Sequence, residues 1–229
     1  MAFHIRYTFR FDDGRSEQFD LTFNDQNMDM IASDLPPPAE WTDLEFCRCD
    51  HCPLNKTTHP QCPPAHHLQN AMTRLGQELS FTPITLEVTT PQRTIITPTT
   101  MSQAFASYMG LIMATTGCPY TQFFKPMASF HLPLASEKET TFRAISSYLL
   151  GQYIAGNTVT DLEGLEHTYQ NMEKVNHGFS LRLRASGQLK EINSLVQLDM
   201  HAKNLSLFLS EAIEDLSPLY ERYLQQIKK

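Results

Sequence analysis

The sequence predicts an α+β fold, in which a small antiparallel sheet comes first and a mostly helical part follows. Apolar residues alternate with polar ones near the start of the chain, and they recur at helical spacing after residue 99. In addition, four of the five cysteines lie within sixteen residues, from Cys47 to Cys62. We therefore expect residues 1–98 to form hairpin, cysteine loop, helix and hairpin, and residues 99–229 to form helices that pack with the first part as one unit.

Two hairpins are predicted in residues 1–98. Apolar and polar residues alternate from Phe3 to Phe11 and again from Phe19 to Phe23, which indicates two strands that each bury one face. Asp13-Gly14 lies between them and suits a tight turn. A second pair of short strands is indicated by the alternation from Ile84 to Val88 and by Ile95-Ile96.

Several helices are predicted from their start signals. Cys62-Pro63-Pro64 opens a helix that we expect to reach about Glu78, because proline is favoured at the first helical position. Thr100 with Gln103, and Ser136 with Glu139, have the spacing of capping boxes. Further helical patterns cover residues 119–129, 162–175 and 189–216, and Ser217-Pro218 restarts the last one.

The composition excludes some classes of function. With 41% apolar and 19% charged residues, the chain has an ordinary globular composition, and its length suffices for a sizeable core without metal. The net charge is −7, of which residues 1–98 carry −6, so the basic surface expected of a nucleic-acid-binding protein is missing. No signal peptide or membrane span is recognisable, which predicts a cytoplasmic protein. A protein partner or a homo-oligomer remains possible.

The clustered cysteines predict thiols or metal ligands, since an odd number of cysteines without an export signal does not suit a disulfide framework. Cys49 and Cys52 form C-x2-C, and His59 and Cys62 form H-x2-C, so a local zinc site with three cysteines and one histidine could form. Cys47 and His51 are further local candidates.

Cys52, Cys62 and Cys118 each precede a proline. Proline favours extended geometry in the residue before it, and it places Cys62 and Cys118 at predicted helix N-termini, where the helix dipole favours thiolate. Cysteine followed by proline also occurs in iron–sulfur ligand runs. The three local cysteines with Cys118 could therefore hold a four-iron cluster or one zinc ion, with zinc slightly favoured.

Two other functions compete with metal binding. Cys118 and His131 could form the nucleophile and base of a thiol-dependent enzyme, although a third catalytic partner is missing. The chain could also be a metal-free module that binds a protein partner. No Gly-rich phosphate loop, nucleophile elbow or zinc-protease motif is present.

Four motifs follow one another in a specific order: Cys49-Asp-His-Cys52-Pro-Leu54, Cys62-Pro63, Gly117-Cys118-Pro119 and His131-Leu-Pro133. In these motifs, and over most of residues 41–176, the chain resembles an uncharacterised bacterial family, a domain of unknown function found as a stand-alone protein. The resemblance implies that Cys49, Cys52, Cys62 and Cys118 belong together and that Cys47 is an extra cysteine. It implies no activity, so the expected role is a regulatory or structural one at a metal or cluster site.

Overall fold

The computed structural model describes residues 2–31, 35–187, 209, 211 and 213–227. The helical pattern predicted for residues 189–216 lies mostly outside these ranges. Within the part of the chain that is described, no helix has both the length and the apolar character needed to cross a membrane.

The N-terminal part forms a four-stranded antiparallel sheet, as the alternating pattern predicts. Its strands are β1 (Ala2–Phe11), β2 (Ser16–Asn24), β3 (Pro83–Thr89) and β4 (Thr94–Thr100), in the order β2-β1-β3-β4. In the register, Tyr7 lies opposite Phe19 on one side and Val88 on the other. The second hairpin therefore adds to the first one along β1.

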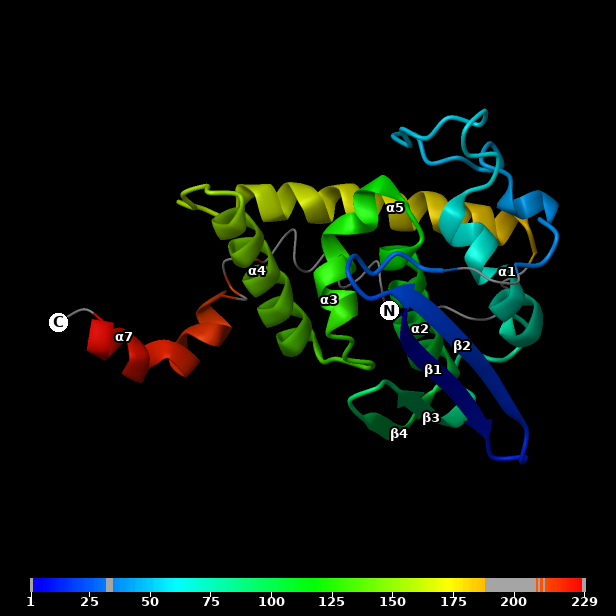
Figure 1. The fold of residues 1–229 in the computed structure, drawn as a ribbon. Helices are drawn as coiled ribbons and strands as arrows, with labels where there is room; N and C mark the ends of the chain where they lie inside the picture. Colours follow the sequence, from blue (N-terminus) through cyan, green and yellow to red (C-terminus); the bar gives the residue numbers. More distant parts are fainter. Residues whose placement is uncertain (1, 32–34, 188–208, 210, 212, 228–229) are drawn as a thin grey trace.

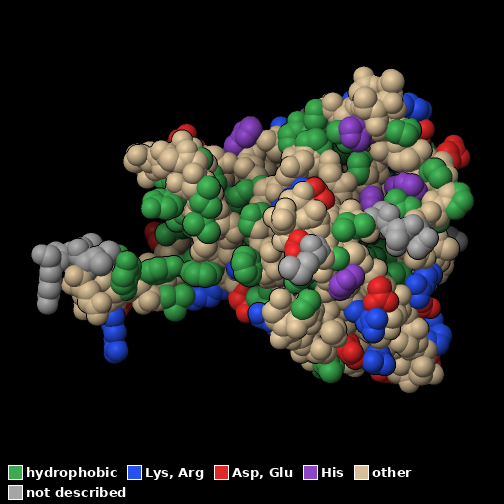
Figure 2. Space-filling model, viewed as in Figure 1, with side chains coloured by type: hydrophobic (Ala, Val, Ile, Leu, Met, Phe, Trp, Pro, Cys, Tyr) green, Lys and Arg blue, Asp and Glu red, His purple; other side chains and the backbone are tan. Residues whose placement is uncertain are grey.

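One face of the sheet is buried and the other is exposed and charged. Ile5, Tyr7 and Phe9 of the central strand β1 are at most 1% exposed. On the opposite face, Arg6 forms an ion pair with Asp20. Figure 2 shows Lys, Arg, Asp and Glu side chains together over the hairpin at the lower right of the molecule. This mixture of both signs gives the sheet a solvated outer surface.

The helical part begins directly after β4. Its elements are α2 (Met101–Thr115), the 3-10 segment η2 (Pro119–Phe124), α3 (Lys125–Ser129), α4 (Glu137–Ile154), α5 (Glu163–Ala185), η3 (Ser217–Tyr220) and α7 (Glu221–Ile227). The predicted capping box at the start of α4 is confirmed, because Ser136 and Glu139 satisfy each other's backbone N–H groups. Thr100 caps α2 by accepting from the backbone N–H of Gln103.

Two helices position the cysteine loop. α1 (Pro63–Leu75) follows Cys62 and packs against α2 and against η1 (Glu40–Thr42). α5 runs across the helical layer, from the end of α4 to the loop that leads into α1 (Figure 1). It packs against η2 near its middle and against η1 near its end. The C-terminal third of α5 therefore lies beside the cysteines of the N-terminal part.

Candidate functional site

The cysteine loop spans residues 43–62 and folds back on itself. The backbone N–H of Leu44 donates to the carbonyl of Pro60, and that of Cys62 donates to Thr42, so both ends of the loop lie side by side. The C-x2-C segment is a turn, in which the N–H of Cys52 donates to the carbonyl of Cys49 at 2.9 Å. These contacts bring Cys49, Cys52 and Cys62 to one side of the loop.

Cys62 and Cys118 lie at the N-termini of α1 and η2, as the proline motifs predict. Their backbones are extended, with φ and ψ of −68° and 115° at Cys62 and −67° and 122° at Cys118. The prolines that follow explain this conformation, because they disfavour helical geometry in the preceding residue. Each cysteine therefore ends an extended segment, and backbone N–H groups of the helical segment that follows, Ala65 and Tyr120, lie within reach of the two thiols.

The four thiols lie within electrostatic reach of one another. Burial, with smaller contributions from Cys62, Cys118 and Cys52, raises the pKa of Cys49 to about 12. Burial likewise raises the pKa of Cys118 to about 11, with smaller contributions from Cys62 and Cys52. Such mutual effects weaken as the distance between the charges grows. Cys49 and Cys118 therefore lie within electrostatic range of Cys52 and Cys62, although they come from different segments of the chain.

The same pKa values correct one expectation. Helix N-termini were expected to favour thiolate at Cys62 and Cys118. The backbone amides of Ala65 and Tyr120 do lower the pKa of these two thiols, but desolvation outweighs them and the net direction is upward. A buried thiolate loses its hydration, and this desolvation is more unfavourable than the backbone hydrogen bonds at the helix N-terminus are favourable. Without a bound cation, these thiols stay protonated at neutral pH.

Gly178 of α5 lets the helix approach the C-x2-C turn. A Cβ atom at this position would lie 2.6 Å from Sγ of Cys49 and 3.2 Å from its Cα. Any side chain would therefore push the turn away from the helix. Because Gly178 has no side chain, Cys49 can pack directly against the backbone of α5.

Arg182 is a buried cation beside the thiols. It is 2% exposed, and its guanidinium donates to the carbonyls of Trp41 at 2.7 Å, Asp43 at 2.6 Å and Leu44 at 3.0 Å. Among the described residues it forms no ion pair with a carboxylate. Its charge lowers the pKa of Cys49 and of Cys62, so it opposes the effect of burial there. Arg182 thus fastens the start of the loop to α5 and favours negative charge on the cysteines.

The other local candidates lie apart from this group. Cys47 is exposed, with a φ of 44°, and His59 is exposed and contacts Oγ1 of Thr58. The ring of His51 packs on Tyr120, with 4.3 Å between the ring centroids. In the described ranges, no group of three or more His, Cys, Asp or Glu side chains is arranged closely enough to hold a metal ion. Among the described residues, the four thiols therefore do not form a coordination sphere.

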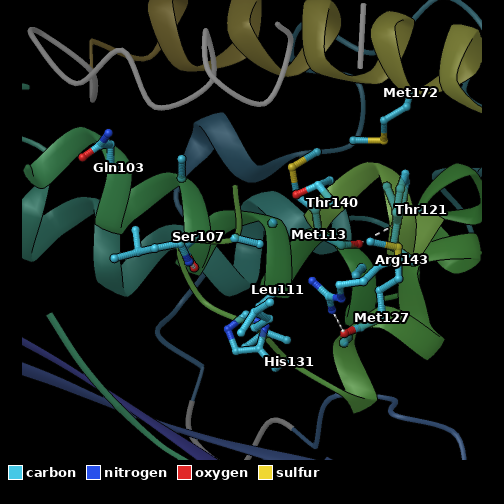
Figure 3. A pocket seen from close by; sticks show the side chains of 18 of the residues that line it. Gln103, Ser107, Leu111, Met113, Thr121, Met127, His131, Thr140, Arg143 and Met172 are labelled. Carbon is cyan, nitrogen blue, oxygen red and sulfur yellow. Dashed lines mark hydrogen bonds between the residues drawn. The ribbon is translucent and has the colours of Figure 1, made fainter. Parts of the chain in front are cut away.

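The hypothetical Cys118–His131 pair does not form a nucleophile and base. Nε2 of His131 lies 2.5 Å from the hydroxyl of Tyr7, and no hydrogen bond joins the ring to Cys118 in the described structure. Burial lowers the pKa of His131 to about 3, so it is a weak base at neutral pH. Figure 3 shows His131 beside Leu111 at the wall of a cavity between the helices.

Sequence reasoning missed Gly178 and Arg182. The signal for Arg182 is its place on the apolar stripe of α5, three residues after Phe179 and seven after Val175, where an aliphatic residue is expected. A charged residue on such a stripe indicates a buried partner. Nothing in the sequence distinguishes Gly178 from an ordinary helical glycine.

Comparisons with known proteins agree with the resemblance stated above. The family model described as "Domain of unknown function (DUF6901)" matches residues 5–221, which is nearly the whole chain. No curated protein and no solved structure matches significantly. The chain therefore belongs to the DUF6901 family, an uncharacterised domain family.

Proposed function

We propose that this protein binds a metal through Cys49, Cys52, Cys62 and Cys118, and that the bound metal has a structural or regulatory role. The proposal is supported by four free thiols from three separate segments, of which Cys49 lies within electrostatic range of the other three and of the buried guanidinium of Arg182. Free thiols of this kind persist in a reducing compartment, so we further propose a cytoplasmic location.

The charges at the site support a thiolate-bound metal. Four thiolates around a zinc ion or a four-iron cluster leave a net negative charge, which needs a cation nearby when it is buried. Arg182 supplies that cation, because its hydrogen bonds go to neutral carbonyls and it forms no ion pair with a carboxylate among the described residues. A metal would also ionise Cys49, Cys62 and Cys118, whose pKa values are raised by burial.

Zinc and an iron–sulfur cluster make different demands on this cysteine set. Zinc–sulfur bonds of about 2.3 Å in a tetrahedron require sulfurs roughly 3.8 Å apart, so zinc would have to draw the four thiols into one sphere. A cluster places several metal ions between the sulfurs and spans a wider set. The shared chemistry is thiolate coordination, and metal analysis separates the two.

The test is metal analysis of protein purified without oxygen. We expect either about one zinc per chain and no colour, or iron and acid-labile sulfide with visible absorption. Cys118→Ser should lower the metal content strongly and make the contact between the cysteine loop and η2 more sensitive to protease. Cys47→Ser is the matched control and should leave the metal content unchanged.

Two results would contradict the proposal. Wild-type protein that binds neither zinc nor iron with at least micromolar affinity would leave a metal-free interaction module as the remaining reading. Unchanged metal stoichiometry in Cys118→Ser, with a loss in His59→Ala or Cys47→Ser, would place the metal in a local loop site instead.

A further inference from the structure

A cavity of about 470 Å³ lies between α2, α3, α4 and α5. Its volume falls within the range of small-molecule sites, roughly 300–1,000 Å³. The wall is mainly apolar, and much of it comes from Met113, Met127 and Met172, whose side chains approach the space from three different helices (Figure 3). Flexible thioether side chains adapt to the shape of an apolar ligand.

Two buried polar side chains of α5 line this cavity without a partner. Asn176 is 2% exposed, and neither its amide nitrogen nor its amide oxygen has a hydrogen bond within the described residues. The hydroxyl of Tyr169, which is 4% exposed, likewise has no partner there. A buried polar group without a partner destabilises the fold, because it has lost its hydration and gained no hydrogen bond in return. A ligand that hydrogen-bonds to these groups would remove this cost.

Arg143 of α4 supplies a positive charge at the same cavity. One of its terminal nitrogens, Nη2, donates to the carbonyls of Met127 at 2.6 Å and of Phe130 at 3.1 Å, which holds the guanidinium at the wall (Figure 3). The nearby carboxylate of Glu139 is occupied by the capping box at Ser136. Among the described residues, Arg143 has no carboxylate within ion-pair distance, so its remaining donors can meet an anion.

Arg143 lies close to Tyr169 and to His131. Burial raises the pKa of Tyr169 and lowers that of His131, and the charge of Arg143 lowers both to a smaller extent, so the hydroxyl and the imidazole are neutral at ordinary pH. The cationic end of the cavity therefore combines one guanidinium with a free hydroxyl. Asn176 lies seven residues beyond Tyr169 on the same helix, which is about 10 Å further along the axis. Met172 lies between them.

We propose that this cavity binds an amphipathic organic carboxylate. The carboxylate meets Arg143 and the hydroxyl of Tyr169, and an apolar stem lies along Met172 toward Asn176. A chain of about ten carbons has the length of this path. A terminal hydroxyl or carbonyl on the stem would meet the amide of Asn176.

Calorimetric titration with decanoate tests the proposal, with decanol as the uncharged probe of the same length. We expect one decanoate per chain and at least tenfold weaker binding of decanol. The terminal hydroxyl of 10-hydroxydecanoate can hydrogen-bond to the amide of Asn176, so this probe should bind more tightly than decanoate. Asn176→Leu should abolish this difference in affinity.

Variants separate the proposed site from nonspecific apolar binding. Tyr169→Phe removes one oxygen and should weaken decanoate binding about fivefold to tenfold, and Arg143→Gln should weaken it more. Tyr148→Phe on α4 is the matched control, because Tyr148 is absent from the cavity wall, and it should bind as the wild type does. Equal affinity for decanoate and decanol, or equal decanoate affinity in Tyr169→Phe and wild type, would overturn the proposal.

Discussion

Replacement of Gly178 by alanine tests whether α5 and the C-x2-C turn are in contact. The new Cβ atom would lie 2.6 Å from Sγ of Cys49 and 3.2 Å from the Cα atom of the same residue. Because one of these atoms belongs to the backbone, the turn or the helix must move by roughly 1 Å to restore ordinary van der Waals separation. Such overpacking costs about 1–3 kcal/mol.

The intrinsic effect of the substitution has the opposite sign. Alanine is favoured over glycine in a helix interior by about 1 kcal/mol. Gly151 in α4 is exposed, and a Cβ there meets nothing within 4 Å, so Gly151→Ala isolates this gain. We expect Gly151→Ala to stabilise the protein by up to about 1 kcal/mol, and Gly178→Ala to be about 1–3 kcal/mol less stable than Gly151→Ala.

Urea denaturation followed by circular dichroism measures both variants, in reducing buffer with a chelator so that metal does not contribute. The difference between the two free energies of unfolding is the cost of the close approach. Equal stabilisation in both variants would show that Cys49 does not lie against Gly178, and it would remove α5 from the cysteine site.

Further predictions concern the contacts around this site and the cavity. Arg182→Gln should lower the free energy of unfolding by about 3 kcal/mol, because one carbonyl of η1 and two of the cysteine loop lose a charged donor. Arg184→Gln on the exposed face should change it by less than about 0.5 kcal/mol, and similar values for the two variants in urea denaturation would refute the anchoring role of Arg182. The folded-state pKa of His131 is about 3, which is below its value in the unfolded state. The unfolded state therefore binds the proton first, and the free energy of unfolding should fall as the pH drops from about 6.5 toward 3. The loss between pH 7 and pH 5 should reach at most about 2 kcal/mol, since the residue is partly exposed, and an equal pH slope in His131→Asn would exclude this origin. Thr121→Val should cost about 1–2 kcal/mol, because the buried hydroxyl donates to the carbonyls of Met113 and Cys118, and Thr121→Ser should lose less in thermal denaturation.

The fold class was predictable because most of its strands and helices follow from the residue pattern within each segment. The alternation from Phe3 to Phe11 places every second side chain on one face, and this face is the buried one in β1. Ser136 and Glu139 form a capping box within four residues, and this local signal marks the start of α4. The extended backbone at Cys62 and Cys118 follows directly from the next proline.

The environment of the candidate site was not predictable in the same way. Which helix covers the cysteine loop depends on packing between segments far apart in the sequence, so Gly178 carries no local signal of its role. The place of Arg182 on the apolar stripe of α5 indicates burial but does not name its partners. The ionisation of Cys118 was expected from a helix dipole, but burial decides it, and burial is a property of the whole fold. The cavity likewise arises only where α2, α4 and α5 meet. The ligand set of Cys49, Cys52, Cys62 and Cys118 stays a prediction.

The anchoring of the cysteine loop by Arg182 has a consequence for the growing chain. Trp41 and Arg182 are 141 positions apart, so the loop leaves the ribosome long before its anchor exists. At about 5–20 residues per second, translation needs roughly 7–28 seconds to cover this distance. During that time the C-x2-C turn lacks the helix that shelters it, and its thiols are open to oxidants and to any free metal. For the metal site proposed above, this order of synthesis predicts that metal binds before α5 covers the thiols.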